Sequence, residues 1–147
     1  MKMKYAALYE LYEALTRMQD VSGFKVAWAI AKNLKNLQTE AEFFEGQKIR
    51  LLRKYGKEEK GRVFINQKDE HYQDFMKEFT ELSEMETEAE LYKVKSDIEE
   101  KDIQCDSATA KDYLLFMKYL MEEPEKEKEE PEKEKGEDEK DGEGSEG

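Results

Sequence analysis

The residue types that usually perform acid–base, nucleophilic and metal chemistry are scarce in this chain. His71 is the only histidine and Cys105 the only cysteine, which excludes zinc sites built from several histidines, HExxH motifs and an internal disulfide. No GxxxxGK[ST] motif is present to cradle a phosphate. Asp106 and Ser107 follow Cys105 at an expected helix start, where thiol pKa values tend to fall. Because no histidine is near to act as a base, we expect Cys105 to be a quiet thiol. The scarcity of reactive residue types also predicts no enzymatic activity, no cofactor and no bound metal.

A row of acidic residues alternates with other side chains after residue 83. Its members are Glu84, Glu86, Glu88 and Glu90. On a strand these carboxylates would share one face, about 7 Å apart. Metal-dependent nucleases use strand acids beside a lysine, and Lys93 and Lys95 are close in sequence, but the D…ExK spacing is missing. We therefore favour a solvated strand edge, which discourages aggregation, over a metal site.

A basic cluster lies earlier in the chain and has a local net charge of +5. Its members are Lys48, Arg50, Arg53, Lys54, Lys57, Lys60 and Arg62. Tyr55 and Phe64 lie beside it, and such a combination is typical of surfaces that bind phosphates and stack on bases. The simpler interpretation, which we favour, is that these cations suit a helix C-terminus and pair with acids elsewhere in an acidic protein.

Trp28 is the only tryptophan, and it lies within the apolar run 26–31. The run predicts that Trp28 packs in the core or between helices. An exposed Trp28 would instead be a natural anchor for a protein interface.

Four helices must position these residues. Apolar side chains recur at helical spacing over about 4–18, 24–55, 72–82 and 108–122. Ser22, Asp69 and Ser107 are the predicted N-caps of the last three helices.

The second helix is long enough to constrain the whole fold. A helix over 24–55 would extend about 48 Å, so it must project, bend or pack against another chain. Gly46 predicts a kink or a break inside it, and Gly56 predicts a left-handed C-cap at its end.

Two short strands complete the expected fold. Residues 62–66 form a β-branched and aromatic run, and the alternation after Met85 favours a strand over about 87–95. We expect these strands to pair antiparallel across the third helix. The predicted class is α+β and mainly helical, with four helices and a small two-stranded antiparallel sheet.

The net charge of −12 is unevenly distributed along the 147 residues. Residues 123–147 hold 13 acids, 5 lysines and no apolar side chain, and the sequence Glu-Glu-Pro-Glu-Lys-Glu-Lys occurs twice, at 122–128 and 129–135. We therefore predict one globular domain over 1–122 and a disordered acidic tail over 123–147. Because no apolar run could span a bilayer or serve as a secretory signal, we expect a cytoplasmic protein without a membrane partner.

The order of these features resembles a family of small proteins of unknown function encoded by tailed phages and prophages of Gram-positive bacteria. The resemblance covers roughly 1–122 and is carried by Leu51-Leu52-Arg53-Lys54-Tyr55-Gly56, by Gly61 with Ile65, by Phe75-Met76-Lys77-Glu78 and by the helix from Ser107 to Leu114. It implies a phage or prophage origin and a place in the host cytoplasm. The family has no settled activity, so the resemblance transfers no functional residue.

Three functions are consistent with the sequence. The favoured one is a non-enzymatic accessory protein that binds another protein, either a host protein or a second copy of itself, because the long second helix needs an apolar partner. The first alternative is an acidic inhibitor that mimics phosphate and blocks a host nucleic-acid-handling or defence machine. The second, less favoured, is an RNA or DNA binder that uses the basic cluster at 48–62.

Overall fold

The computed structural model describes residues 1–95 and 97–122, and the tail predicted at 123–147 lies outside them. Its helices are α1 (Tyr5–Arg17), α2 (Phe24–Tyr55), α3 (Tyr72–Glu84) and α4 (Ala110–Leu120), with the short 3-10 helix η1 (Glu100–Ile103). Its strands are β1 (Lys2–Lys4), β2 (Lys57–Glu59), β3 (Arg62–Phe64) and β4 (Glu86–Glu88). The predicted fold class, a mainly helical protein with a long second helix and small antiparallel pairing, is confirmed for the described residues.

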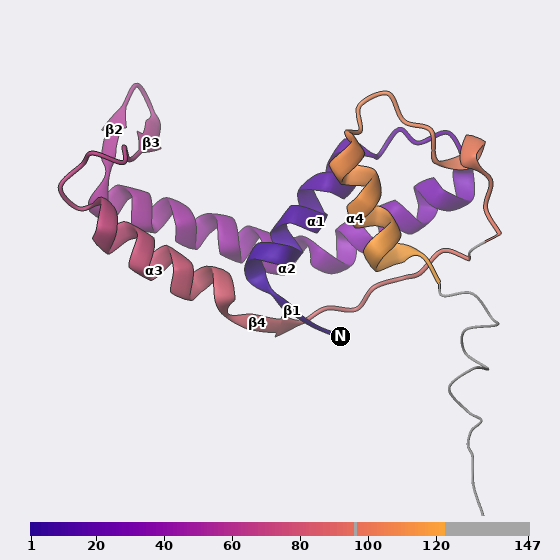
Figure 1. Cartoon of the computed structure of the whole chain (residues 1–147), viewed down its shortest axis with the longest axis horizontal. Coiled ribbons are helices and arrows are strands. Elements are labelled where there is room, and N and C mark those ends of the chain that lie inside the picture. The colour runs from indigo at the N-terminus through magenta and orange to yellow at the C-terminus, as the bar shows by residue number, and fades with distance from the viewer. Residues whose placement is uncertain (96, 123–147) are drawn as a thin grey trace, which may run out of the picture.

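Helix α2 runs the length of the fold, and the other elements pack along it (Figure 1). It contacts α1 and η1, and further along it contacts α3 and β3. The apolar face of α2 is therefore covered within one chain along both of its halves. The length of α2 no longer argues for a second copy of the protein.

The predicted break at Gly46 is wrong, because α2 continues through this residue without interruption. Gly46 is exposed, and no atom lies within 4 Å of the position where a Cβ would stand. A glycine costs about 1 kcal/mol inside a helix. Burial of Leu37, Ala41 and Phe44 in the turns just before it outweighs that cost.

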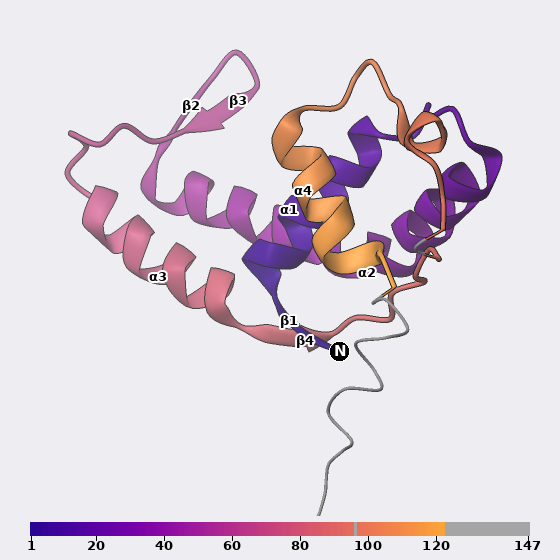
Figure 2. The same cartoon turned by 45° about the vertical axis from the view of Figure 1, so that its right-hand side comes forward.

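Two hydrophobic clusters hold the helices together. The larger joins α1, the first half of α2 and α4, and includes Leu8, Leu11, Leu15, Val26, Ile30, Phe116 and Leu120. The smaller joins the start of α1 to α3 through Tyr5, Phe44 and Leu82. Figure 2 shows the same division, with α1 and α4 together and α3 beside the second half of α2. Met117 lies within the apolar run of α4 but is half exposed.

The predicted pairing between 62–66 and 87–95 is wrong. Strand β1 pairs antiparallel with β4, and β2 pairs antiparallel with β3. The second pair is a local hairpin, in which Lys60 and Gly61 both have positive φ angles, of 52° and 78°. Two such residues form the tight turn that matches the twist of antiparallel strands, so β3 pairs with the adjacent residues Lys57–Glu59 and not with residues 87–95.

The predicted N-caps are also wrong, because α2, α3 and α4 follow Gly23, His71 and Thr109. Ser22 donates its hydroxyl hydrogen to the carbonyl of Lys101, and Asp69 accepts a hydrogen bond from the backbone of Asn66. The cap of α4 is Thr109 rather than Ser107. The Thr109 hydroxyl accepts from the N–H of Asp112, and Asp112 accepts from the N–H of Thr109. Asp112 thus completes the capping box that usually uses glutamate.

Gly56 ends α2 as predicted, but its backbone is extended, with φ −103°, and not left-handed. Glycine is needed here for space. A Cβ at Gly56 would lie 2.2 Å from the carbonyl oxygen of Phe64, where β3 crosses the end of α2.

Candidate functional site

The strongest candidate site is an aromatic groove at the start of α2. Three large side chains in it face solvent: Phe24 is 80% exposed, Trp28 53% and Tyr92 45%. They line a pocket of about 770 Å³ together with Lys25, Ala29, Lys93, Val94, Lys95, Asp97, Ile98 and Glu122. We call this pocket the aromatic groove. Exposed aromatic residues clustered around a hollow are typical of binding surfaces rather than of the ordinary solvated surface.

The aromatic rings are placed by two different elements. Phe24 and Trp28 lie one turn apart at the start of α2, on neighbouring positions of the same helix face. Tyr92 comes from the extended segment after β4 and meets Trp28 edge to face, with ring centroids 4.7 Å apart and planes at 86°. This geometry is the one that aromatic pairs prefer. It holds both rings in a fixed orientation at the surface.

A buried asparagine fixes the segment that carries Tyr92. The side-chain oxygen of Asn33 accepts from the N–H of Tyr92 at 2.7 Å, and its amide nitrogen donates to the carbonyl of Tyr92 at 2.8 Å. The same nitrogen also donates to the carbonyl of Ala29. Asn33 is fully buried, so these bonds satisfy a polar group that would otherwise be costly inside the core.

The wall opposite α2 is fixed by the end of α4. The N–H of Val94 donates to the carbonyl of Leu120, and the N–H of Glu122 donates to the carbonyl of Val94. Val94 and Ala29 are buried and form the apolar floor of the groove. The groove is therefore built from α2, the extended segment and the end of α4, each held by backbone bonds or core packing.

The rim of the groove is charged. Lys25, Lys93 and Lys95 contribute positive charge, while Asp97 and Glu122 contribute negative charge. An apolar floor with a mostly basic rim suits a ligand that combines an apolar or ring-shaped group with carboxylates.

The basic cluster lies at the other end of α2 and on the adjoining hairpin (Figure 1). Part of it is engaged within the chain. Lys54 lies 3.2 Å from Glu78, Lys57 lies 3.9 Å from Asp69, and Lys48 stands over the ring of Phe79. Arg50 and Arg53 are exposed, with no acid within 4.0 Å among the described residues.

The aromatic residues next to the basic cluster are poorly placed for stacking on bases. Tyr55 and Phe64 are half buried, and the Tyr55 hydroxyl donates to Glu78. Lys54 and Lys57 also form ion pairs within the chain. The basic cluster therefore agrees better with a helix end whose positive charge is neutralised within the chain than with a surface that binds nucleic acid.

The acidic row does not form one strand face. Glu84 is the last residue of α3, only Glu86 and Glu88 lie in β4, and Glu90 follows the strand. The prediction fails for Glu84 because α3 extends further than the alternation suggested, and for Glu90 because β4 ends at Glu88. Glu86 and Glu88 stand opposite Lys4 and Lys2 of β1, and the N-terminal ammonium lies 3.3 Å from Glu88. No group of three or more metal-ligating side chains occurs in the described part of the chain.

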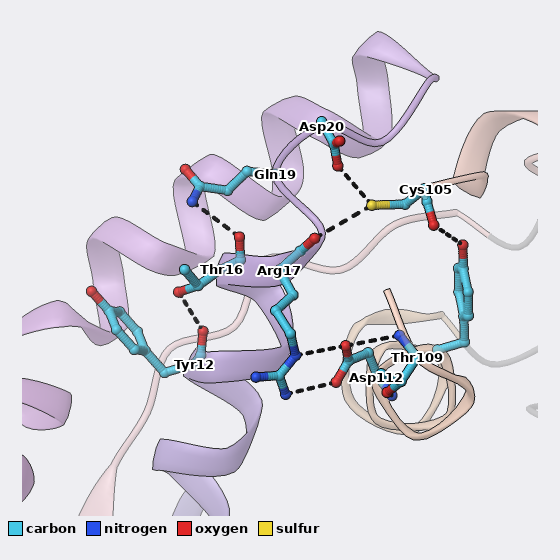
Figure 3. Close-up of polar contacts among 9 residues, drawn as sticks. Tyr12, Thr16, Arg17, Gln19, Asp20, Cys105, Thr109 and Asp112 are labelled. Atoms are coloured by element: carbon cyan, nitrogen blue, oxygen red, sulfur yellow. Dashed lines mark hydrogen bonds and ion pairs between the residues drawn. The ribbon is translucent and has the colours of Figure 1, made fainter. Parts of the chain in front are cut away.

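The single cysteine belongs to a structural network between α1 and α4 (Figure 3). The thiol of Cys105 donates to the carboxylate of Asp20 and the carbonyl of Arg17, and its own carbonyl accepts from Tyr113. Burial, and then the hydrogen bond to Asp20, raise the pKa of the Cys105 thiol. The helix start that would lower this pKa does not lie at Cys105, since α4 begins only at Ala110, and the raised pKa agrees with the quiet thiol expected from the sequence.

Arg17 and Asp112 form the main ion pair of this network (Figure 3). Two guanidinium nitrogens donate to the two carboxylate oxygens at 2.8 and 2.9 Å, and Asp112 is fully buried. The hydrogen bond from Arg17 is the main cause of the lowered pKa of Asp112. The two side chains bind each other and join α1 to α4, so neither is available as a reactive group.

His71 is exposed at the start of α3, with Nδ1 3.3 Å from a carboxylate oxygen of Asp74. It is not among the residues that line the aromatic groove.

Comparisons of this chain with protein-family models, curated proteins and solved structures found no match. The resemblance to the phage family therefore stays a prediction. No helix among the described residues combines the length and the hydrophobicity needed to cross a membrane.

Sequence reasoning singled out Trp28 but missed Phe24 and Tyr92. Phe24 could have been found, because it lies four residues before Trp28 and outside the buried stripe that contains Val26 and Ile30. Tyr92 had no such signal, since the hydrogen bonds that bring it to Trp28 join residues 59 positions apart.

Proposed function

We propose that this chain is a non-enzymatic accessory protein that binds a segment of another protein in its aromatic groove. The observation that carries the proposal is the pair of exposed rings, Trp28 and Tyr92, held edge to face beside an apolar hollow. Rigid exposed aromatic residues are the residues that most often dominate the binding energy of protein interfaces. The resemblance adds the proposal of a phage or prophage origin and of action in the host cytoplasm.

The chemistry of the groove defines the partner that we propose. A hollow of about 770 Å³ can take one or two apolar side chains of a bound segment. Lys25, Lys93 and Lys95 then favour carboxylates on either side of that anchor. The partner is thus an acidic protein segment with an apolar or ring-bearing residue in its middle.

A selection from a displayed peptide library on the immobilised full-length protein tests this function. We expect acidic peptides with a central aromatic, aliphatic or proline residue to be enriched. A parallel selection on Trp28→Ala should lose them, whereas Leu114→Ala, which removes an apolar side chain 68% exposed on α4, should keep them. Enrichment of the same peptides by Trp28→Ala would contradict the proposal.

Nucleic-acid binding through the basic cluster is the second candidate. Its support is that Arg50 and Arg53 are exposed and have no acid within 4.0 Å among the described residues. Phosphate mimicry has less support, because Lys2 and Lys4 lie opposite two of the four predicted acids.

A further inference from the structure

We infer that the acidic segment 123–147 of this same chain occupies the aromatic groove and competes with the partner for it. The inference rests on the proposed function, because it concerns the regulation of the same groove. Its occupant is chosen on three grounds: where the described chain ends, the residues that follow, and the charge of the rim.

The described chain ends at the groove itself. Glu122 is one of the lining residues, and its backbone is bonded to Val94 on the floor. Pro124 follows only two residues later, and Pro131 nine residues later. The average end-to-end distance of an unfolded chain of nine residues is about 15–18 Å, which keeps both prolines within reach of the groove.

The residues of the segment match the groove chemically. Each copy of Glu-Glu-Pro-Glu-Lys-Glu-Lys places a proline between glutamates. Proline segments bind aromatic-lined grooves because their backbone is already close to the bound conformation. In this groove a proline ring would pack on Trp28 and Tyr92, while the flanking glutamates would face Lys93 and Lys95.

The basic cluster is the competing place for an acidic segment, and two observations favour the groove. Arg53 lies about 37 Å from Trp28 along α2, so the first copy of the repeat reaches the groove at a much higher effective concentration. The basic cluster also lacks an exposed aromatic ring for a proline, since Tyr55 and Phe64 are half buried.

The proposed contact is weak enough to be displaced. Exposed ion pairs contribute little individually, and a short tether provides an effective concentration in the millimolar range. A partner with a better apolar anchor would displace the segment. Proteins that bind the groove more weakly than the segment would be excluded from it.

Trp28 is the only tryptophan, so its fluorescence reports on the groove without a label. In the full-length protein at low salt, we expect acrylamide to quench Trp28 less than in Pro124→Gly with Pro131→Gly. Quenching should also rise in Lys93→Glu with Lys95→Glu, and in Glu123→Lys with Glu125→Lys. Combining these two charge reversals should restore the wild-type value, because opposite charges face each other again.

Arg50→Glu with Arg53→Glu is the matched control, since it reverses two charges at the far end of α2 and should leave quenching unchanged. Identical quenching in the wild type and the proline variant would overturn the inference. Failure of the combined charge reversal to restore the wild-type value would overturn it as well.

A binding measurement separates this inference from the proposed function. A peptide selected by the groove should bind Glu123→Lys with Glu125→Lys about 2- to 10-fold more tightly than wild type, as removal of a tethered competitor predicts. Equal affinity would overturn the competition and leave the groove's function standing. A library that gives no Trp28-dependent peptide would remove the proposed function, whatever the quenching shows.

Discussion

Asn33 and Tyr92 are joined as two strands of a sheet would be, except that one partner is a side chain. The amide of Asn33 bonds both the N–H and the carbonyl of Tyr92 from a fully buried position on α2. This pairing places an otherwise unsupported extended segment against the helix and brings Tyr92 to Trp28. The aromatic groove therefore depends on a residue that does not line it.

Replacing Asn33 should destabilise the fold and loosen the groove together. We expect Asn33→Ala to lower the free energy of unfolding by about 1–3 kcal/mol, because both backbone groups of Tyr92 lose their partner. Denaturant unfolding measures this change, and acrylamide quenching of Trp28 should rise in the folded variant. Asn36→Ala is the control, since Asn36 is exposed and makes only a 3.4 Å contact with Glu90. Equal stability of the two variants would contradict the role of Asn33.

Breaking the Arg17–Asp112 ion pair should lower the free energy of unfolding at least as much as Asn33→Ala does. We expect Arg17→Met to lower the free energy of unfolding by about 3 kcal/mol, because Asp112 stays buried without its main partner. Lys111→Met removes the exposed pair with Glu10 and should change stability by less than about 0.5 kcal/mol.

The effect of pH on this pair has a definite sign. The pKa of Asp112 is lowered in the folded protein, so its contribution is fully present above about pH 4 and is lost as the pH falls through the lowered value. The stability difference between wild type and Arg17→Met should therefore be largest at neutral pH and shrink in acid. A difference that grows below pH 4 would show that another group is responsible.

Two glycines should respond to alanine in opposite directions. Gly46→Ala adds a methyl group in open space on a continuous helix and should stabilise the protein by about 0.5–1 kcal/mol. Gly56→Ala brings a Cβ against the backbone of Phe64 and should destabilise it by about 1–3 kcal/mol. Thermal unfolding of both variants tests the pair, and a stabilising Gly56→Ala would mean that β3 does not cross the end of α2 as described.

The basic cluster gives a separate prediction about nucleic acid. We expect the protein to pass through a single-stranded DNA or RNA column at physiological salt, because Lys54 and Lys57 are paired within the chain. Any retention at low salt should disappear in Arg50→Glu with Arg53→Glu. Retention at physiological salt that this variant abolishes would favour the nucleic-acid function instead.

The helices could be predicted from the sequence, because the local spacing of apolar residues determines them. The helical spacing over 4–18 predicted α1, in which Leu8, Leu11 and Leu15 are fully buried, and the helix predicted over 24–55 has the same bounds as α2. The strand partners could not be predicted, because β1 and β4 are joined by contacts between residues more than 80 positions apart.

The candidate site was predictable only in part, for the same reason. Trp28 was identified by residue type, but its exposure depends on Val26, Ile30 and Asn33 taking the buried face of α2. The capping box of α4 was missed although its residues are local, because Asp112 stands where glutamate is more usual.

The most direct test of the aromatic groove is a titration of the best selected peptide into the ¹⁵N-labelled full-length protein. We expect shifts of the single Trp28 indole N–H signal and of the Tyr92 and Val94 amides, with no shift at Arg53. We also expect a loss of about 30-fold in affinity, or about 2 kcal/mol, in Trp28→Ala. Unchanged affinity in that variant, or shifts centred on the basic cluster, would contradict the proposed function.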